Sequence, residues 1–288
     1  MSTAASFGPL TALETITLTD ADARSRAVIA PTRGGMVTRF EVAEKPVLFL
    51  DVASLVDETK NVRGGNPVLF PSPGPLAGDQ FARQGKTGSM KQHGFARLRA
   101  WSVVASTPAE VTLELASDDA TRAQFPWDFV ARLRYALAGT TLTVETRVEN
   151  RGNTAMPYAL GFHPYFAIPD ADKARAKIAT NATRAYDNVT KTNIEMSGPI
   201  DLTQKEVDLH LIDHTPSSAT LDRGDDRIVV SGDAEFGRWV VWTLAGKDFV
   251  CLEPWTAAAN ALNTGEKLFD LAPGATKSVT FTIALEKS

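Results

Sequence analysis

The sequence predicts an all-β protein built as a large antiparallel β-sandwich, and three observations support this. Apolar and polar residues alternate with a period of two in residues 110–115, 142–148 and 279–285. A strand with this alternation buries one face and exposes the other. Gly, Pro, Asn and Asp punctuate these runs, as at residues 138–140 and 149–153. No stretch keeps a long helical period, so two sheets packed face to face satisfy the pattern.

The other expected elements follow the same rules. Further strands are expected at residues 13–19, 36–42, 98–106, 128–137, 227–231, 238–244 and 249–252. The best short helical candidate is residues 118–124, which stops before Phe125 and Pro126 because the residue preceding a proline disfavours helix. The chain has no internal repeat, low-complexity tract or flexible Gly/Ser linker, so we expect residues 1–288 to form one domain.

The amino-acid composition and net charge exclude several classes of protein. The chain has 288 residues, of which 43% are hydrophobic and 22% charged, so a large core can form and disorder is not expected. A net charge of -4 gives no general basic surface for nucleic acid or for a membrane. The lone Cys251 excludes an intrachain disulfide, and neither a leader nor a membrane-spanning run is visible. We expect a cytoplasmic protein, with the choice between monomer and homodimer left open.

Residues 63–97 lack the alternation of apolar and polar residues that is typical of strands. This region is rich in Gly, Pro and polar residues, and it ends in a segment that contains His93 and Arg97. Long loops within compact domains are often functional. The alternative is an exposed excursion without a role.

Three short motifs each supply one side chain that can transfer protons. They are QHGFAR at residues 92–97, GFHPYF at 161–166 and CLEPW at 251–255. Two imidazoles and one carboxylate can act as general acids and bases near neutral pH. Taken alone, His93 and His163 fit ordinary structural positions, whereas a carboxylate at Glu253 within an apolar run is costly unless it is satisfied. Together the motifs favour catalysis.

The motifs also carry a resemblance to a known family. With RGGNPVLFP at residues 63–71, DATRAQFPW at 119–127 and LAPG at 271–274, they lie in order along nearly the whole chain. This set resembles the aldose 1-epimerases (mutarotases), especially the shorter galactose mutarotase-like and hexose-6-phosphate mutarotase-like branches. The resemblance implies a β-supersandwich with a sugar cleft on one sheet. It also implies interconversion of the α and β anomers of an aldohexose or its 6-phosphate, without a cofactor or metal.

The same resemblance implies roles for three residues. Glu253 is the base that takes the proton of the anomeric hydroxyl, and His163 is the acid that protonates the ring oxygen. His93 binds the sugar near that oxygen. An acid of this kind needs a protonated imidazole, and we expect a nearby carboxylate to raise the protonated fraction of His163.

Further residues are expected to bind the sugar. Arg63 and Arg97 match arginines that help to hold phosphate in the hexose-6-phosphate branch, although the sequence departs from that branch at Asn66 and at residues 72–75. Asp213 resembles a sugar-binding aspartate, or it forms a turn before Pro216.

Aromatic side chains are the remaining sugar-binding candidates, because their faces suit the apolar face of a sugar. Trp255, which lies beside Glu253 in the sequence, is the strongest of them, followed by Phe162 and Phe81. The other tryptophans are assigned to the core: Trp101, Trp127, Trp239 and Trp242.

Three other functions remain open from the sequence. A glycoside hydrolase could use Glu253 and Asp213, since retaining enzymes hold two carboxylates roughly 5–5.5 Å apart. A non-catalytic sugar-binding domain could keep the same cleft. A zinc hydrolase is more distant, because no His-Glu-x-x-His or paired-cysteine spacing supports it.

Overall fold

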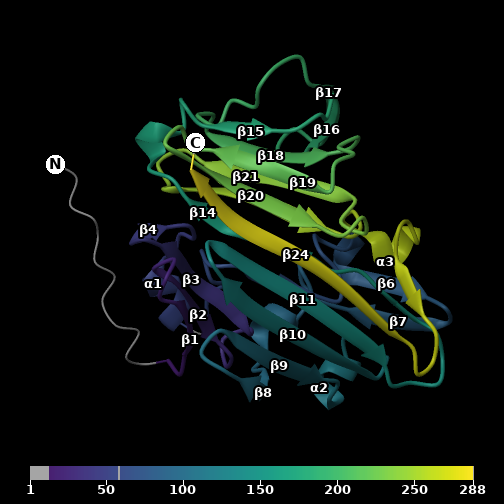
Figure 1. The fold of residues 1–288 in the computed structure, drawn as a ribbon. Helices are drawn as coiled ribbons and strands as arrows, with labels where there is room; N and C mark the ends of the chain where they lie inside the picture. The colour runs from purple at the N-terminus through teal and green to yellow at the C-terminus, as the bar shows by residue number, and fades with distance from the viewer. Residues whose placement is uncertain (1–12, 58, 288) are drawn as a thin grey trace.

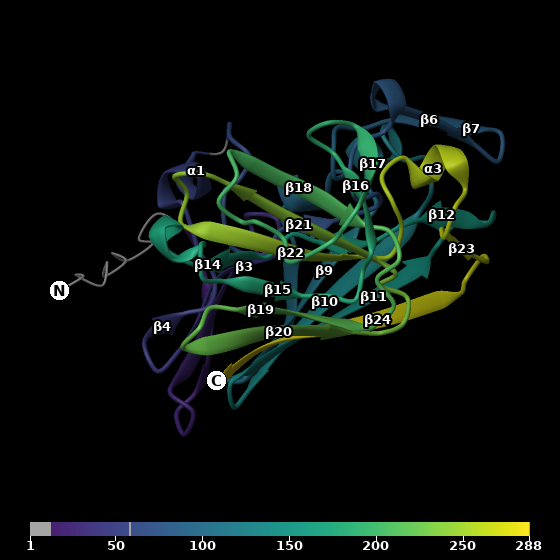
Figure 2. The same cartoon turned by 90° about the horizontal axis from the view of Figure 1, so that it is seen from above.

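Two large antiparallel sheets lie face to face in the computed structural model, which describes residues 13–57 and 59–287 (Figure 1). The first sheet has the strand order β15-β19-β20-β24-β11-β10-β9-β8. The second sheet has the order β17-β16-β18-β21-β22-β13-β5, and β14 also pairs with β22. Seen from above, the two sheets form separate layers (Figure 2). The expected all-β sandwich is confirmed.

The strand bounds show how the chain alternates between the sheets. The first sheet consists of β8 (Ser102–Ser106), β9 (Glu110–Ala116), β10 (Phe129–Ala138), β11 (Thr141–Asn150), β15 (Lys177–Ala179), β19 (Ser218–Asp222), β20 (Asp226–Gly232) and β24 (Thr276–Lys287). The second sheet consists of β5 (Val68–Leu69), β13 (Gly161–Phe162), β14 (Tyr165–Ala167), β16 (Arg184–Asp187), β17 (Thr192–Glu195), β18 (Glu206–Leu211), β21 (Arg238–Leu244) and β22 (Phe249–Trp255).

Smaller elements surround the two sheets. A four-stranded sheet is formed by β1 (Ile16–Asp20), β2 (Ser25–Ala30), β3 (Met36–Val42) and β4 (Lys45–Pro46). Two further pairs are β6 (Gln80–Arg83) with β7 (Lys86–Ser89), and β12 (Met156–Tyr158) with β23 (Phe269–Leu271). The short helices are α1 (Val52–Val56), α2 (Asp119–Arg122) and α3 (Ala261–Thr264), with 3-10 turns at Ala77–Asp79, Ala96–Leu98 and Asp170–Asp172. None of the helices in the described part of the chain is long and apolar enough to cross a membrane.

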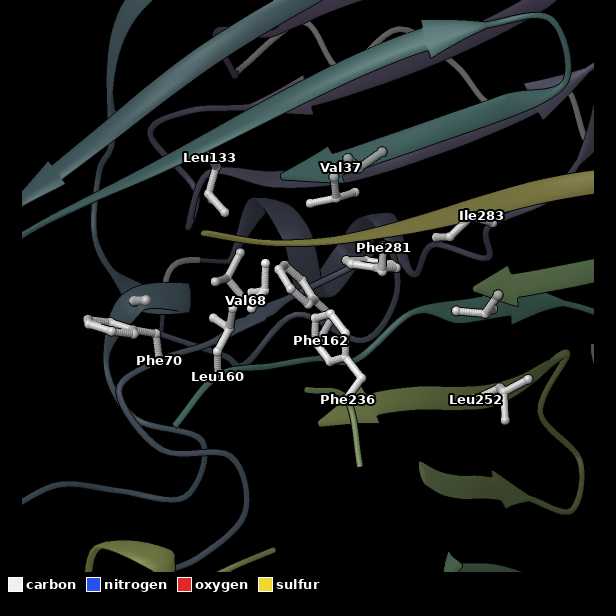
Figure 3. Close-up of a cluster of buried hydrophobic side chains, with 14 of the residues drawn as sticks. Val37, Val68, Phe70, Leu133, Leu160, Phe162, Phe236, Leu252, Phe281 and Ile283 are labelled. Carbon is white, nitrogen blue, oxygen red and sulfur yellow. The ribbon is translucent and has the colours of Figure 1, made fainter. Parts of the chain in front are cut away.

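The core lies between the two large sheets because each contributes its apolar face. Phe281 and Ile283 of β24 belong to the same buried cluster as Phe162 of β13 and Leu252 of β22 (Figure 3). The rings of Phe162 and Phe281 have centroids 4.5 Å apart, close enough for direct packing. Since neighbouring residues of a strand point to opposite faces, this packing turns the residues on either side of Leu252 away from the core.

The observed strands match the alternating segments best. The strand expected at residues 36–42 is β3, and the last strand extends beyond the expected 279–285. The expected helix is a single turn, α2, whose first residue follows a capping box made by Asp118 and Thr121. The strand expected at 98–106 begins only at Ser102, because a 3-10 turn precedes it. Residues 63–97 include three short strands, β5, β6 and β7, within the expected loop.

Candidate active site

A cavity of about 860 Å³ lies on the face of the second sheet that is turned away from the core. Its floor is formed by side chains of β16, β18, β21 and β22, and loops at residues 61–63, 75–77, 92–97 and 258–260 form its walls. His93, His163 and Glu253 all line this cavity, together with Arg63, Arg97 and Trp255. The structure therefore brings together six of the nine site candidates named from the sequence.

Glu253 is mounted in the middle of the second sheet. It lies on β22, which pairs with β21 on one side and with β13 and β14 on the other. Its side chain is only 2% exposed. The indole N–H of Trp255 donates to Glu253 Oε2 at 3.1 Å, and Gly161 leaves room for this indole because an added Cβ there would overlap it. The carboxylate is thus held rigidly, with Oε1 facing His163.

His163 lies directly beside this carboxylate. Its Nε2 is 3.5 Å from Glu253 Oε1. The ring stacks on Tyr165 with centroids 4.7 Å apart, and it meets the ring of Trp242 edge-on at 5.7 Å. The backbone N–H of His163 donates to the carbonyl of Pro67 at 3.1 Å. The two groups form a close pair that can exchange a proton, and because they are the expected base and acid, this candidate pair is called the catalytic pair.

The second imidazole is fixed as a hydrogen-bond donor. The backbone N–H of Gly74 donates to His93 Nδ1 at 3.0 Å, and the backbone N–H of His93 donates to the carbonyl of Gly74 at 2.9 Å. Since a backbone N–H can only donate, Nδ1 carries no proton and Nε2 carries it instead. Burial, followed by the neighbouring His163 and Arg97, lowers the pKa of His93 well below its usual range. His93 is therefore a neutral donor.

The backbone at His93 depends on its neighbour Gly94. Gly94 has a φ of +68°, and an added Cβ would overlap the carbonyl oxygen of Phe70. Gly94→Ala is expected to lower the free energy of unfolding by about 2–4 kcal/mol, because both the left-handed conformation and the backbone clash oppose a side chain. Denaturant unfolding measures this loss. Gly198→Ala is the matched control, since nothing lies within 4 Å of its added Cβ; equal losses in both variants would contradict the prediction.

Burial determines the protonation of the catalytic pair. It lowers the pKa of His163 to about 3, assisted by the positive charge of Arg97. It raises the pKa of Glu253 well above its usual value, and the charge of Asp208 acts in the same direction. The expectation that a carboxylate would raise the pKa of His163 is not met, because desolvation of the imidazolium is the largest effect and Glu253, itself shifted toward its uncharged form, does not offset it. Between a pH of about 3 and the raised pKa of Glu253, the pair is neutral overall and holds one proton.

Two arginines reach the cavity from its loops. The guanidinium of Arg97 donates to the carbonyl of Gln92 at 2.9 Å, and burial lowers its pKa. The guanidinium of Arg63 lies 5.4 Å from the centre of the Trp242 ring, within range of a cation–π contact. Both charges face the same cavity as the catalytic pair. They supply donors suited to an anionic group or to paired hydroxyls.

Comparison with known proteins identifies the family. Residues 14–284 match the family model described as aldose 1-epimerase. The chain belongs to the aldose 1-epimerase family. These enzymes are isomerases that interconvert sugar anomers, and the protein is accordingly an enzyme of carbohydrate metabolism.

Several individual proteins resemble this epimerase. The Slr1438 protein of Synechocystis sp. PCC 6803 is 36% identical, with a TM-score of 0.93 and 96% of each chain covered. A galactose mutarotase-like protein of Lactobacillus casei ATCC 334 shares the fold at 24% identity and a TM-score of 0.77, with 95% of this chain and 100% of that chain covered. A protein of Cenchrus ciliaris named "Putative glucose-6-phosphate 1-epimerase" is 27% identical over 243 residues, which cover 80% of this chain and 67% of that one.

The structure does not bring Asp213 to the cavity of this epimerase. Its carboxylate accepts hydrogen bonds from the hydroxyl and backbone N–H of Thr183 and from the backbone N–H of Arg184. These bonds lower its pKa to about 2. Asp213 instead holds the backbone at the start of β16, 29 to 30 residues away in the sequence. A glycoside hydrolase that pairs Glu253 with Asp213 is therefore not favoured.

Sequence reasoning missed several polar residues of the cavity, including two on β18. Asp208 and His210 project from β18 into it, and His210 Nε2 is 3.5 Å from Asp208 Oδ1. The amide of Asn188 donates to Asp208 Oδ2 at 2.7 Å. The signal was present, since the polar residues at 206, 208 and 210 alternate with apolar residues at 207, 209 and 211.

Three aromatic residues were assigned wrongly. Trp242 was assigned to the core but lines the cavity, where its indole N–H donates to Glu206 Oε1 at 3.2 Å. Phe162 and Phe81 were candidates for sugar contact but are both buried in the core. The cause for Phe162 is its position next to His163, because adjacent strand residues face opposite ways. Phe81 packs against Trp127 instead, with ring centroids 6.2 Å apart.

One group of described residues has the donors of a metal site. His163, Cys251 and Glu253 each offer one ligand atom, and these atoms lie within 4.8 Å of one another. Burial raises the pKa of the Cys251 thiol well above its usual range, with the nearby Glu253 adding to the effect. A cation would have to displace protons from both the thiol and the catalytic pair. The donor chemistry therefore suits proton transfer better than a resident metal.

Proposed function

We propose that Glu253 and His163 catalyse mutarotation of an aldohexose or its 6-phosphate as a coupled base and acid. The observation that carries this proposal is the 3.5 Å approach of His163 Nε2 to Glu253 Oε1 inside a cavity lined with polar side chains. Although burial favours the form with the proton on Glu253, the reacting form carries it on His163: the Glu253 carboxylate takes the proton of the anomeric hydroxyl while the His163 imidazolium protonates the ring oxygen. The C1 to ring-oxygen bond breaks, C1 becomes a carbonyl, and the ring oxygen becomes a hydroxyl.

Ring closure reverses these transfers after rotation about the C1–C2 bond. The protonated carboxyl of Glu253 returns a proton to the carbonyl oxygen, and His163 takes the proton of the attacking hydroxyl. In each direction the catalytic pair gives up one proton and gains another, so its proton count is constant. This fits a buried pair that is neutral overall, because no net charge enters the cavity during the reaction.

Other residues support the substrate in this proposal. The neutral His93 donates from Nε2 toward the ring oxygen, and the N–H of Trp255 keeps Glu253 Oε2 occupied so that Oε1 does the proton transfer. Arg63 and Arg97 provide a place for the 6-phosphate, in line with the name of the Cenchrus ciliaris relative. A free hexose would place its hydroxyls there instead.

Magnetisation-exchange NMR of the α and β anomers tests the proposal directly. Glucose, galactose and glucose 6-phosphate are compared at equal concentration, and the spontaneous exchange rate is subtracted. We expect acceleration of at least one of them. Saturable binding without faster exchange would instead identify a sugar-binding domain, and release of an aryl alcohol from a nitrophenyl glycoside would identify a hydrolase.

The pH dependence of kcat/KM follows from the shifted pKa values. The catalytic pair gains a second proton only as the pH falls toward about 3 and loses its single proton only above the raised pKa of Glu253. We therefore expect no acid limb near the usual histidine value of about 6.5. Exchange rates measured from about pH 4 to 9, with circular dichroism to confirm folding, check this. A fall in kcat/KM centred near that histidine value on the acid side would contradict it.

A further inference from the structure

The cavity extends well beyond the catalytic pair. Register across the second sheet places Glu253 opposite Val240, Val240 opposite His210, His210 opposite Tyr186, and Tyr186 opposite Asn193. All five side chains line the same cavity. Adjacent strands are about 4.8 Å apart, so four steps carry this row roughly 19 Å from Glu253 to the edge strand β17.

The cavity is also larger than one sugar ring requires. Its volume of about 860 Å³ equals that of roughly 29 water molecules at about 30 Å³ each. A free hexose has only six carbons and six oxygens. A hexose held at the catalytic pair would leave most of the row beyond His210 unfilled.

The chemistry of the distal part suits a neutral saccharide. The rings of Trp255, His210 and Tyr186 follow one another edge-to-face, with centroid separations of 5.2 and 6.1 Å. Within the described residues, the hydroxyl of Tyr186 and the side-chain amide of Asn193 have no hydrogen-bond partner. Aromatic faces and free uncharged polar groups match the apolar faces and hydroxyls of sugar rings, and the charged residues that also line the cavity, Asp208, Glu206 and Lys191, present both signs of charge and so do not favour an ionic unit.

We propose that Tyr186 and Asn193 form a second saccharide subsite, so that the preferred substrate is the reducing end of a neutral disaccharide or longer oligosaccharide. This inference rests on the proposed function, because the reducing unit must sit at Glu253 and His163. The next unit lies across β16 and β17, away from the loops that carry Arg63 and Arg97. The Tyr186 hydroxyl and the Asn193 amide hydrogen-bond its hydroxyls.

A panel of reducing glucose disaccharides, joined 1→2, 1→3, 1→4 or 1→6, tests the subsite by magnetisation-exchange NMR with glucose as reference. For at least one linkage we expect a KM about tenfold lower than that of glucose, the effect of one or two added hydrogen bonds with a ring contact. Tyr186→Phe and Asn193→Ala should each raise that KM by about two- to tenfold while the KM of glucose stays unchanged.

Thr192→Ala is the matched control, since Thr192 is the neighbour of Asn193 on β17 and faces the other way. It should leave both KM values at those of the parent. If no linkage gives a KM below that of glucose, or if Tyr186→Phe and Asn193→Ala change both KM values equally, the second subsite is wrong while the glucose rate still supports mutarotation. If glucose and all disaccharides exchange at the spontaneous rate, the proposed function itself fails.

Discussion

Glu253→Gln is expected to reduce enzyme-catalysed anomer exchange by about 10²–10⁴-fold, the usual contribution of a positioned general base. Glutamine keeps the shape of the side chain and can still accept the N–H of Trp255. Because burial already favours the uncharged acid at this position, the neutral amide should cost little stability. Magnetisation-exchange NMR gives the rate, and thermal unfolding gives the stability.

Glu206→Gln serves as the control for this loss. Glu206 is a carboxylate of the same cavity, but it is exposed and pairs with Trp242 rather than with His163. It should keep an exchange rate within about threefold of the parent, since it is given no part in proton transfer. Full activity in a correctly folded Glu253→Gln variant would overturn the role of Glu253.

His163→Asn is expected to lower the exchange rate by a similar factor of about 10²–10⁴, because asparagine cannot protonate the ring oxygen. The pH dependence of stability is a second measurement, which distinguishes this catalytic role from a structural one. The folded pKa of about 3 lies below the unfolded value, so the unfolded state alone takes up the proton between these values. His163 therefore costs stability as the pH falls from about 6.5 toward 3.

Asparagine does not titrate, so the His163→Asn variant lacks the loss of stability that His163 causes as the pH falls. Relative to the parent, the His163→Asn variant should gain roughly 2 kcal/mol in free energy of unfolding on going from about pH 7.5 to 5. His214→Asn is a suitable control, because His214 hydrogen-bonds Thr180 and Ser218 away from the catalytic pair and should not affect exchange. A His163→Asn variant with the parental rate, or with an unchanged pH dependence of stability, would show that the assigned protonation is wrong.

The sequence predicted best the strands that bury one face and expose the other. The strand at Met36–Val42 could be predicted to the residue, and the alternating segments that became β9, β10, β11 and β24 were found within a few residues. The two- and three-residue strands β5, β13 and β14 could not be predicted, since alternation needs several residues to show. β13 and β14 form by pairing with β22, and β5 forms by pairing with β13, and no local sequence pattern reports these pairings.

The site residues that lie in the short motifs could be predicted from the sequence. His93, His163, Glu253 and Trp255 do converge, but the choice of aspartate depended on which side chains of β18 face the cavity. Asp208 lies within that strand, whereas Asp213 lies past its end and bonds to the backbone of Thr183 and Arg184. The pKa direction of His163 also escaped sequence reasoning, because adjacency to a carboxylate was foreseeable and the extent of desolvation was not.

The residue proposed as the base and the residues proposed to select the sugar come from different parts of the fold. Glu253 sits on a central strand that is bonded on both sides, while Arg63 and Arg97 come from loops and Asn193 from an edge strand. Loops and edges tolerate sequence change far better than the middle of a sheet. Substitutions in these loops and in the edge strand could therefore change which sugar binds without altering the position of Glu253.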